Sequence, residues 1–180
     1  RDSLALVAWP DADLAGDLMT TKSTSGFYLE VIGSGTPECA ERCFPISWGC
    51  HRQGSTSQHT GEAEIVSLAS CLRKEVMPTQ ILLSKLLRRP VRSVLCEDNN
   101  TAIISVRKGY SPNMRHLART QRISIGLLHE TIHDEADHPE GDIELIKIDT
   151  KIHKGDMFTK ELEVRNYVEA IRRIGMKTVD

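Results

Sequence analysis

Carboxylates stand where several of the expected secondary-structure elements begin or end. These acids are Asp11, Glu62, Glu64, Asp98 and Asp156. Any one of them alone is explained by turn formation, helix capping or the helix dipole. If the fold gathers four of them they repel one another, and bound Mg²⁺, which prefers oxygen ligands and phosphates, relieves that repulsion. Two such ions about 4 Å apart can promote phosphodiester hydrolysis, so the pattern predicts metal-dependent phosphoryl chemistry on nucleic acid.

Hydrophobic patterning predicts the elements that would position these acids. Three runs rich in apolar, aromatic and β-branched residues predict strands joined as an antiparallel meander, the first of them ending at Pro10. A helix capped by Thr60 follows, and Pro78 should kink or break it near its middle. Helices and strands then alternate. The predicted strands are 4–9, 24–32, 43–50, 91–98 and 141–149, and the predicted helices are 59–89, 100–108, 114–132 and 153–176.

The order of these elements predicts an α/β (mixed α+β) fold, with one five-stranded mixed sheet flanked by helices. A chain of 180 residues is most simply one domain, 1–180, with its core at about 4–176. Its content of 39% hydrophobic and 27% charged residues is ordinary for a soluble protein, and no apolar run is long enough to span a bilayer. Because the first residues read as a strand rather than a signal peptide, we expect a piece of a longer, intracellular chain.

The charge is distributed unevenly along the chain. A formal net charge of −2 argues against a globally basic nucleic-acid binder. Residues 99–129 nevertheless contain no acid. This segment is equally consistent with a solvated basic helix and with a surface that contacts a nucleic acid. Its basic residues are Arg107, Lys108, Arg115, Arg119 and Arg122.

The five cysteines show no tight repeat. Cys39 and Cys43 could begin a zinc site, but no second Cys or His pair follows at finger spacing. Reduced thiols of an intracellular protein are therefore the favoured interpretation.

Seven motifs in the chain occur together in a known family. They read WPDADLAGD, KSTSGFYLEV, PISWGCHRQG, STSQHTGEAEIVSLA, LCEDNNTAI, RTQRIS and KGDMFTK, in this order. The set resembles the ribonuclease H domain of copia-type (Pseudoviridae) LTR-retrotransposon Pol polyproteins, in which SDADWAGD, KSTSGY, ISWSSKKQ, STAEAEY, CDNQSA, RTKHIDI and ADIFTK are typical. The resemblance covers about residues 7–160. Each motif is weak by itself, whereas the ordered set is specific.

This resemblance implies an RNase H-like fold and a metal-dependent endonuclease. The implied reaction is hydrolysis of the RNA strand of RNA/DNA hybrids during reverse transcription, leaving a 3′-hydroxyl and a 5′-phosphate. The implied cofactors are two Mg²⁺ ions, for which Mn²⁺ can substitute. The implied partners are an RNA/DNA hybrid and the adjacent reverse transcriptase domain of the same polyprotein, without a membrane. The expected location is the cytoplasm, within a virus-like particle, or the nucleus.

The resemblance also implies four catalytic metal ligands: Asp11, Glu64, Asp98 and Asp156. Asp11 and Asp156 would hold the ion that activates water, and Asp11, Glu64 and Asp98 the ion facing the leaving oxygen. Helical periodicity leaves the choice between Glu62 and Glu64 open. The family pattern of a glutamate followed at once by an aliphatic residue favours Glu64.

Substrate contacts are expected from hydroxyl, amide and basic side chains near these motifs. The expected residues are Ser23, Ser25, Asn99, Asn100, Arg115, Arg119 and Arg122. His153 or His138 could assist turnover, although a surface histidine is the simpler interpretation of either, and Trp48 is expected in the core or on a sheet face rather than as a stacking platform. Departures from the family pattern leave every expected metal ligand in place. They are Pro10, Leu14, Gln121, Arg122 and Gly155.

Two other functions are compatible with this sequence. A catalytically silent or domesticated RNase H-like module would bind nucleic acid or act as a scaffold, and loss of an acid would favour it, but no acid is lost. An integrase-type transferase or an exonuclease would use fewer or differently spaced acids, and the KSTSG and MFTK motifs argue against it.

Overall fold

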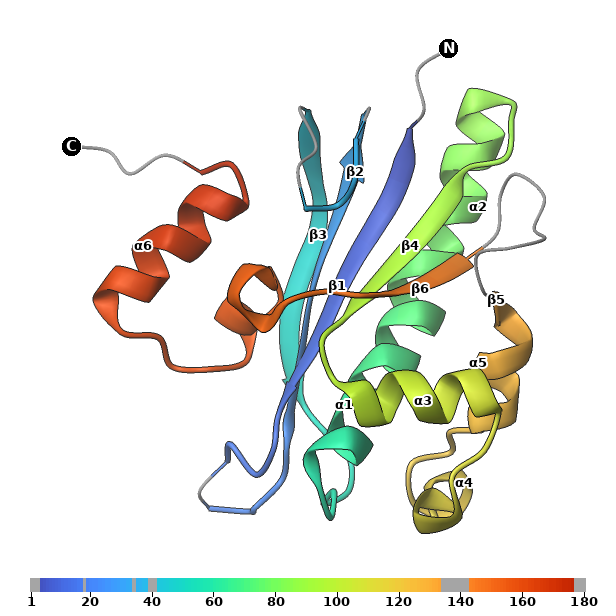
Figure 1. Cartoon of the computed structure of the whole chain (residues 1–180), viewed down its shortest axis with the longest axis vertical. Coiled ribbons are helices and arrows are strands. Elements are labelled where there is room, and N and C mark those ends of the chain that lie inside the picture. Colours follow the sequence, from blue (N-terminus) through green and yellow to red (C-terminus); the bar gives the residue numbers. More distant parts are fainter. Residues whose placement is uncertain (1–3, 18, 34, 39–41, 134–142, 177–180) are drawn as a thin grey trace.

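The computed structural model describes residues 4–17, 19–33, 35–38, 42–133 and 143–176. They form a six-stranded mixed sheet in the order β3-β2-β1-β4-β6-β5, with helices packed against it (Figure 1). The first three strands are an antiparallel meander, and β4, β6 and β5 continue the sheet in parallel from β1. The strands are β1 (Ala5–Asp13), β2 (Thr24–Ile32), β3 (Cys43–Arg52), β4 (Arg92–Glu97), β5 (Ile132–His133) and β6 (Ile143–Lys147).

All five predicted strands are present, and the two-residue β5 is added at the sheet edge. The first strand is longer than predicted, because it runs through Pro10 to Asp13. Its parallel pairing with β4 stops at Ala8, so β1 pairs with β2 alone beyond that point. A strand paired on one side tolerates proline, which cannot donate a hydrogen bond to the sheet. Asp11 therefore lies in the part of β1 that β4 leaves uncovered.

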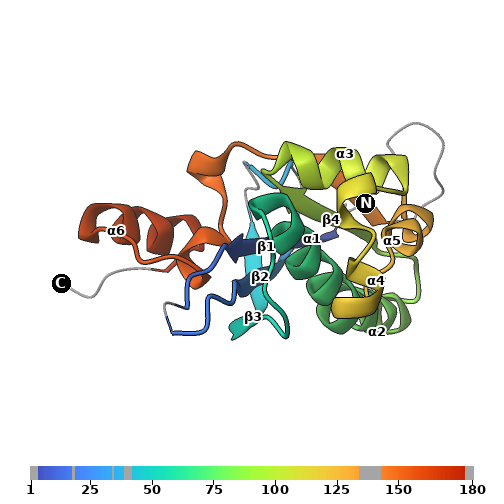
Figure 2. The same cartoon turned by 90° about the horizontal axis from the view of Figure 1, so that it is seen from below.

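The predicted helix 59–89 forms without a sharp break. It consists of α1 (Thr60–Cys71), a π-helical turn (Leu72–Val76) and α2 (Met77–Leu87). The π turn ends two residues before Pro78, which lacks the N–H that an α-helix would need there, and wider turns of this kind absorb such an interruption. The predicted apolar stripe of α1 packs on the sheet in the larger core cluster. Figure 2 shows α1, α2 and α4 on one side of the sheet.

The prediction of one helix over 114–132 is wrong. The segment forms α4 (Leu117–Thr120) and α5 (Ile125–Thr131). Between them Arg122 adopts a left-handed backbone with φ of 57°, and the Ser124 hydroxyl accepts a hydrogen bond from the Leu127 N–H and caps α5. A left-handed residue and a new cap end one helix and start another. By contrast, α3 (Asn100–Lys108) forms as predicted.

The C-terminal tail is helical over less of its length than predicted. The α-helix α6 covers Val164–Arg173, and the part before it contains the short 3₁₀ turns Thr150–Ile152 and Asp156–Phe158. These turns pack on the face of the sheet opposite α1, where Ile152, Met157 and Phe158 contact the second core cluster. That cluster holds the odd-numbered side chains of β1, whereas Leu6 and Ala8 face α1. The alternation of a strand thus assigns Asp11 to the face that the 150–160 segment covers.

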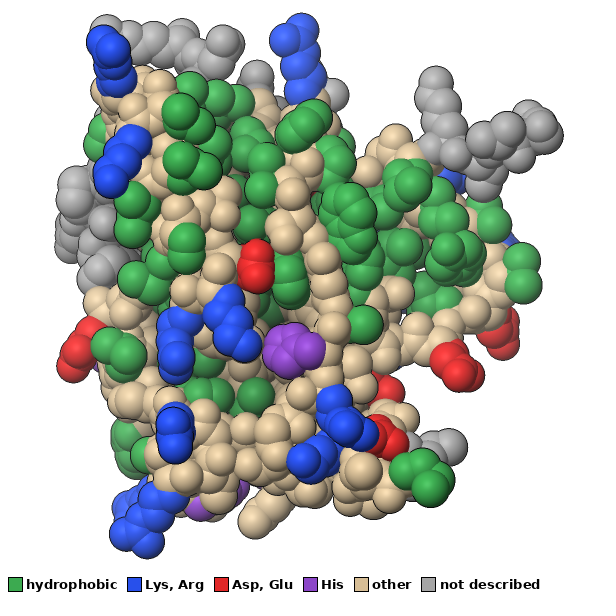
Figure 3. Space-filling model, turned by 180° about the vertical axis from the view of Figure 1, so that it is seen from behind, with side chains coloured by type: hydrophobic (Ala, Val, Ile, Leu, Met, Phe, Trp, Pro, Cys, Tyr) green, Lys and Arg blue, Asp and Glu red, His purple; other side chains and the backbone are tan. Residues whose placement is uncertain are grey.

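Hydrophobic side chains are exposed on α2 and on the edge strand β3, on the face shown in Figure 3. No residue of α2 is buried. Trp48, expected in the core or on a sheet face, lies on β3 and is 60% exposed, so it belongs to this surface. No helix of the described chain combines the length and the apolar character needed to cross a bilayer.

The cysteines that the structure describes are unpaired. Cys71 and Cys96 are buried, and Cys43 and Cys50 are exposed. Among the described residues no cysteine joins a group that could hold a metal, and Cys39 lies outside them.

Candidate active site

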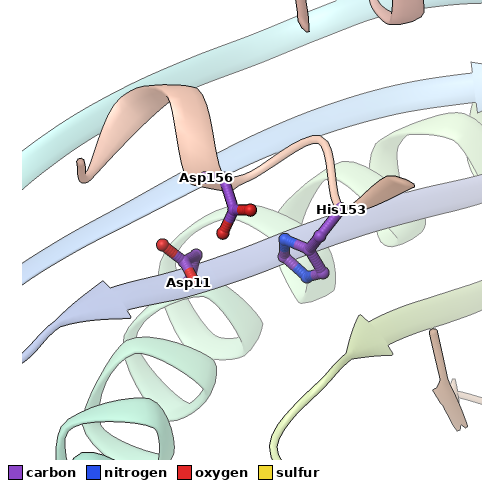
Figure 4. A group of neighbouring side chains, drawn as sticks. All are labelled: Asp11, His153 and Asp156. Atoms are coloured by element: carbon purple, nitrogen blue, oxygen red, sulfur yellow. The ribbon is translucent and has the colours of Figure 1, made fainter. Parts of the chain in front are cut away.

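The four predicted carboxylates converge beside the uncovered end of β1. Asp11 comes from β1, Glu64 from α1, Asp98 from the residue after β4, and Asp156 from a 3₁₀ turn. Ligand atoms of Asp11, Glu64 and Asp98 lie within 4.8 Å of one another, and so do those of Asp11, His153 and Asp156. Figure 4 shows the carboxylates of Asp11 and Asp156 facing each other. Asp11 is shared by both groups, as the resemblance implies for the ligand of two ions.

Asp11 is held from several sides and is only 1% exposed. The Ser67 hydroxyl, from α1, donates a hydrogen bond to the Asp11 carbonyl oxygen at 2.7 Å. The Thr159 hydroxyl donates to one carboxylate oxygen, and the ammonium of Lys160 lies 3.2 Å from the other. Lys160 also contacts Asp156, at 2.7 Å. The carboxylate of Asp11 is therefore fixed before any ligand arrives.

The two glutamates of α1 have different surroundings. Glu62 is fully buried, accepts a hydrogen bond from the Gln58 N–H and lies 2.9 Å from Nε2 of His116. Glu64 is 3% exposed, and one of its oxygens has no hydrogen-bond partner among the described residues. Burial, together with the neighbouring carboxylates Glu97 and Asp11, raises the pKa of Glu64 well above its ordinary value. Glu64, not Glu62, therefore joins the carboxylate group.

A fifth acid, Glu97, completes this cluster and is absent from the sequence prediction. It is the last residue of β4 and fully buried; one oxygen accepts the Asn99 N–H at 3.0 Å and the other has no described partner. Burial raises its pKa, and the adjacent Asp98 adds to the effect. The available signal was an acid at the end of an otherwise apolar strand. Buried carboxylates without partners and a donor set of hard oxygens fit a divalent cation.

The segment that carries Asp156 approaches β1 closely. A Cβ on Gly155 would lie 2.6 Å from the carbonyl oxygen of Trp9 and 2.9 Å from Cβ of Asp11. On the other side, Lys154 pairs with the buried Glu30 at 2.5 Å, and the Trp9 indole donates to the same carboxylate oxygen. These contacts lock the turn against β1 and set the position of Asp156.

His153 is buried rather than on the surface, which corrects the simpler interpretation of this residue. Its Nε2 lies 3.0 Å from the Cys96 carbonyl oxygen and its Nδ1 accepts the Gly155 N–H. A ring that donates through Nε2 and accepts through Nδ1 is neutral. Both nitrogens are thus used to hold the turn. His138 lies outside the described residues.

A pocket of about 310 Å³ opens beside the carboxylates. Residues that lie far apart in the sequence line this one space. Its lining residues are Ala12, Asp13, Leu14, Thr60, Glu64, Asp98, Asn99, Thr150 and Lys160.

The predicted substrate-contacting residues divide into two sets. Ser23 and Ser25 are buried and accept hydrogen bonds from the Ala15 N–H and the Gln53 side chain, respectively, so both hydroxyls are engaged within the protein. Asn99 lines the pocket, where its side chain also caps α3. The other predicted residues are exposed and lie outside the pocket lining: Asn100, Arg115, Arg119 and Arg122.

The chain is similar in sequence and in fold to known proteins. No family model matches the chain. Over 173 residues, 95% of the chain, it is 25% identical to the retrovirus-related Pol polyprotein from transposon TNT 1-94 of Nicotiana tabacum, of which it spans 11%. Its structure is similar to RNase H1 from the halophilic archaeon Halobacterium salinarum NRC-1, with a TM-score of 0.52 and 12% identity over 86% of this chain and 94% of that one. A weaker likeness, with a TM-score of 0.40 and 10% identity, covers all of this chain and 21% of the prototype foamy virus protease-reverse transcriptase.

These comparisons confirm the RNase H-like fold and the resemblance to a retrotransposon Pol polyprotein. The fold follows from the structural match, and the resemblance to Pol from the sequence match. The assignment of individual residues to a metal or a substrate stays a prediction.

Proposed function

We propose that this chain is the ribonuclease H domain of a retrotransposon Pol polyprotein and hydrolyses the RNA strand of RNA/DNA hybrids with divalent cations. Its RNase H-like fold and its similarity to a Pol polyprotein support a nuclease of the ribonuclease H type. The observation that carries the proposal is the meeting of Asp11, Glu64 and Asp98 within 4.8 Å beside an open pocket. Structural roles alone leave buried acids without partners unexplained.

The residues present would hold two ions. Asp11, Glu64 and Asp98 would hold one Mg²⁺ or Mn²⁺ ion, and Asp11 with Asp156 the other. When bound, such ions activate a water and stabilise the leaving oxygen. The chain itself contributes a rigid carboxylate at Asp11, fixed by Ser67 and the 150–160 segment. A preorganised ligand does not have to be ordered when the substrate binds.

The basic segment is placed where it could bind the phosphates of the hybrid. Thr120 and Gln121, at the end of α4, hydrogen-bond to Ser55, in the loop that leads into α1. The exposed Arg119 and Arg122 therefore lie near the loop that leads into the helix carrying Glu64. Contacts of this kind give affinity and position without reading the base sequence.

We further propose that the chain acts as one domain, 1–180, beside a reverse transcriptase domain of the same polyprotein. The sequence similarity to a much longer Pol polyprotein supports this arrangement. Reverse transcription would take place in the cytoplasm, within a virus-like particle, or in the nucleus.

The test is cleavage of a labelled RNA/DNA hybrid with Mg²⁺. Asp98→Asn keeps the size of the side chain and removes its charge. Since loss of even an outer partner of a metal ligand costs about 10–100-fold, we expect loss of Asp98 to lower the rate at least about 100-fold. The circular dichroism spectrum should stay unchanged. Folded wild-type protein that binds the hybrid and does not cleave it with Mg²⁺ or Mn²⁺ would refute the proposal.

That refuting result would support the second candidate, a catalytically silent nucleic-acid-binding module. One observation favours this candidate, because the ammonium of Lys160 lies between Asp11 and Asp156, where a cation would bind. A silent module could use the lysine in place of an ion. The cleavage assay separates the two functions.

A further inference from the structure

One side chain of the site is itself a cation. Nζ of Lys160 lies 2.7 Å from Oδ1 of Asp156 and 3.2 Å from Oδ1 of Asp11. Lys160 follows Asp156 by four residues, so one short segment supplies both a carboxylate and its counter-ion. The lysine side chain is 35% exposed, whereas that of Asp11 is fully buried.

The position of Lys160 matters because of the charges around it. Asp11 and Asp156 face each other, and the burial of Asp11 leaves little room for water to screen their repulsion. The lysine removes that repulsion. By contrast, neither Glu64 nor Asp98 forms an ion pair with a described residue. The site is thus divided into a half that the chain neutralises and a half that it leaves uncompensated.

A divalent ion would need the same two carboxylates. An ion bound by Asp11 and Asp156 would lie close to the ammonium of Lys160, which contacts one oxygen of each, and two cations repel each other strongly at such short range. The displaced lysine side chain could move into the pocket, which Lys160 lines together with Glu64 and Asp98. A phosphate in that pocket would offer the displaced ammonium a new anionic partner.

We propose that Lys160 is a built-in competitor for the divalent cation of the Asp11–Asp156 half of the site. This inference rests on the proposed function, because it concerns the ions used in that reaction. In the absence of nucleic acid, one ion binds to Asp11, Glu64 and Asp98, and the second half stays closed by the lysine. The affinity for a second ion is then set by the cost of displacing Lys160.

Mn²⁺ binding to the 180-residue chain without nucleic acid tests the proposal. The titration is followed by calorimetry and by the electron paramagnetic resonance signal of free Mn²⁺. Lys160→Met removes the charge and keeps a long side chain, and Lys85→Met makes the same change at an exposed position of α2. We expect Lys160→Met to bind the second Mn²⁺ at least about tenfold more tightly than the wild type does. This is a modest effect for the removal of a partly buried charge. Lys85→Met should bind as the wild type does.

Further variants tie the effect to the proposed half of the site. In the absence of metal, Lys160→Met should have a lower Tm, and Mn²⁺ should raise that Tm more than it raises the Tm of the wild type. Adding Asp156→Asn to Lys160→Met should remove the gain in affinity. If Lys160→Met does not fold without metal, Lys160→Gln, which retains a hydrogen-bond donor, replaces it.

The proposal is overturned if the charge-removing variants bind Mn²⁺ no more tightly than the wild type, or if the gain survives Asp156→Asn. These binding results do not depend on cleavage. An active nuclease with unchanged Mn²⁺ affinities would contradict the role of Lys160 and leave the proposed function intact. If the wild type does not cleave the hybrid but Lys160→Met binds the second Mn²⁺ more tightly, the role of Lys160 is supported and the proposed function is refuted.

Discussion

Glu62 and Glu64 are two residues apart on one helix, yet only Glu64 belongs to the carboxylate cluster. Their positions around the helix do not separate them, since each flanks the apolar stripe. Glu62 is engaged by the nearby Gln58 N–H and by His116, which is distant in the sequence, whereas Glu64 lines the pocket. Such contacts depend on the tertiary fold, so periodicity could not predict them.

Matched substitutions separate the two roles. Glu64→Gln should lower Mg²⁺-dependent cleavage at least about 100-fold, as expected for a ligand. It should also raise the Tm of the metal-free chain at alkaline pH, where the wild-type Glu64 would carry a buried charge. Glu62→Gln should lower stability by about 1 kcal/mol through its hydrogen bonds while the chain still cleaves. Cleavage and thermal melts measure both effects. The assignment fails if Glu62→Gln is the inactive variant and Glu64→Gln the active one.

At the scale of elements, sequence patterns predicted what depends on local periodicity. The meander, the strand before Asp98, and α1 and α3 all follow from apolar spacing and caps. The helix prediction is wrong for the segments 114–132 and 153–163. There the backbone departs from a continuous helix because of contacts with other parts of the chain. Arg122 takes a left-handed conformation, and the turn after His153 is held by Glu30 and the Cys96 carbonyl. Neither cause is visible in a window of neighbouring residues.

The turn that carries Asp156 depends on the absence of a side chain at Gly155, where the related family usually has alanine. Since a Cβ there would lie 2.6–2.9 Å from β1 and from His153, Gly155→Ala should push the turn away from Asp11. We expect a stability loss of about 1–3 kcal/mol, typical of overpacking, and weaker cleavage at saturating hybrid. Chemical denaturation and the turnover rate measure the two effects. Gly54→Ala, whose nearest atom would lie 3.8 Å away, is the control. Equal behaviour of the two variants would contradict the close approach.

For the whole molecule, the buried acids of the site lower stability, and a bound cation would relieve this effect. Glu97 is fully buried beside Asp98, and its pKa is raised from 4.5 to about 8. A carboxyl with a raised pKa in the fold favours its neutral form. Its contribution to stability is therefore full below about pH 4.5 and is lost as the pH rises through about 8. The adjacent Glu64 shifts in the same direction.

The metal-free chain should accordingly become less stable between about pH 5 and pH 8. Each kcal/mol lost lowers the Tm by about 2–4 °C in a domain of this size. Thermal melts in a chelator measure the slope, and added Mg²⁺ should reduce it. Glu97→Gln, which cannot ionise, should flatten the curve. A Tm that is constant or rises over this range, in wild type and variant alike, contradicts the prediction.

The sequence motifs predicted the four carboxylates that the fold brings together, although not the reason they can coexist. Asp98 follows β4 and Asp156 begins a 3₁₀ turn, whereas Asp11 lies near the end of β1 and Glu64 in the second turn of α1. The ordered motifs were enough to select all four. The sequence analysis did not identify Glu97 and Lys160, because the importance of Glu97 lies in its burial and that of Lys160 in charge compensation. Both properties exist only after folding. Both residues sit directly beside or shortly after a predicted ligand, inside the recognised motifs.

The place of Asp156 in the chain also has a consequence for biosynthesis. Asp11, Glu64 and Asp98 precede residue 99, whereas the turn with Asp156 follows β6, the last strand of the described chain. A ribosome delivers the acidic cluster first and its counter-ion Lys160 last. A nascent or prematurely terminated chain that ends after β6 would carry every strand of the sheet and an uncompensated, incomplete centre. The proposed activity would therefore require synthesis of the chain through Asp156 and Lys160.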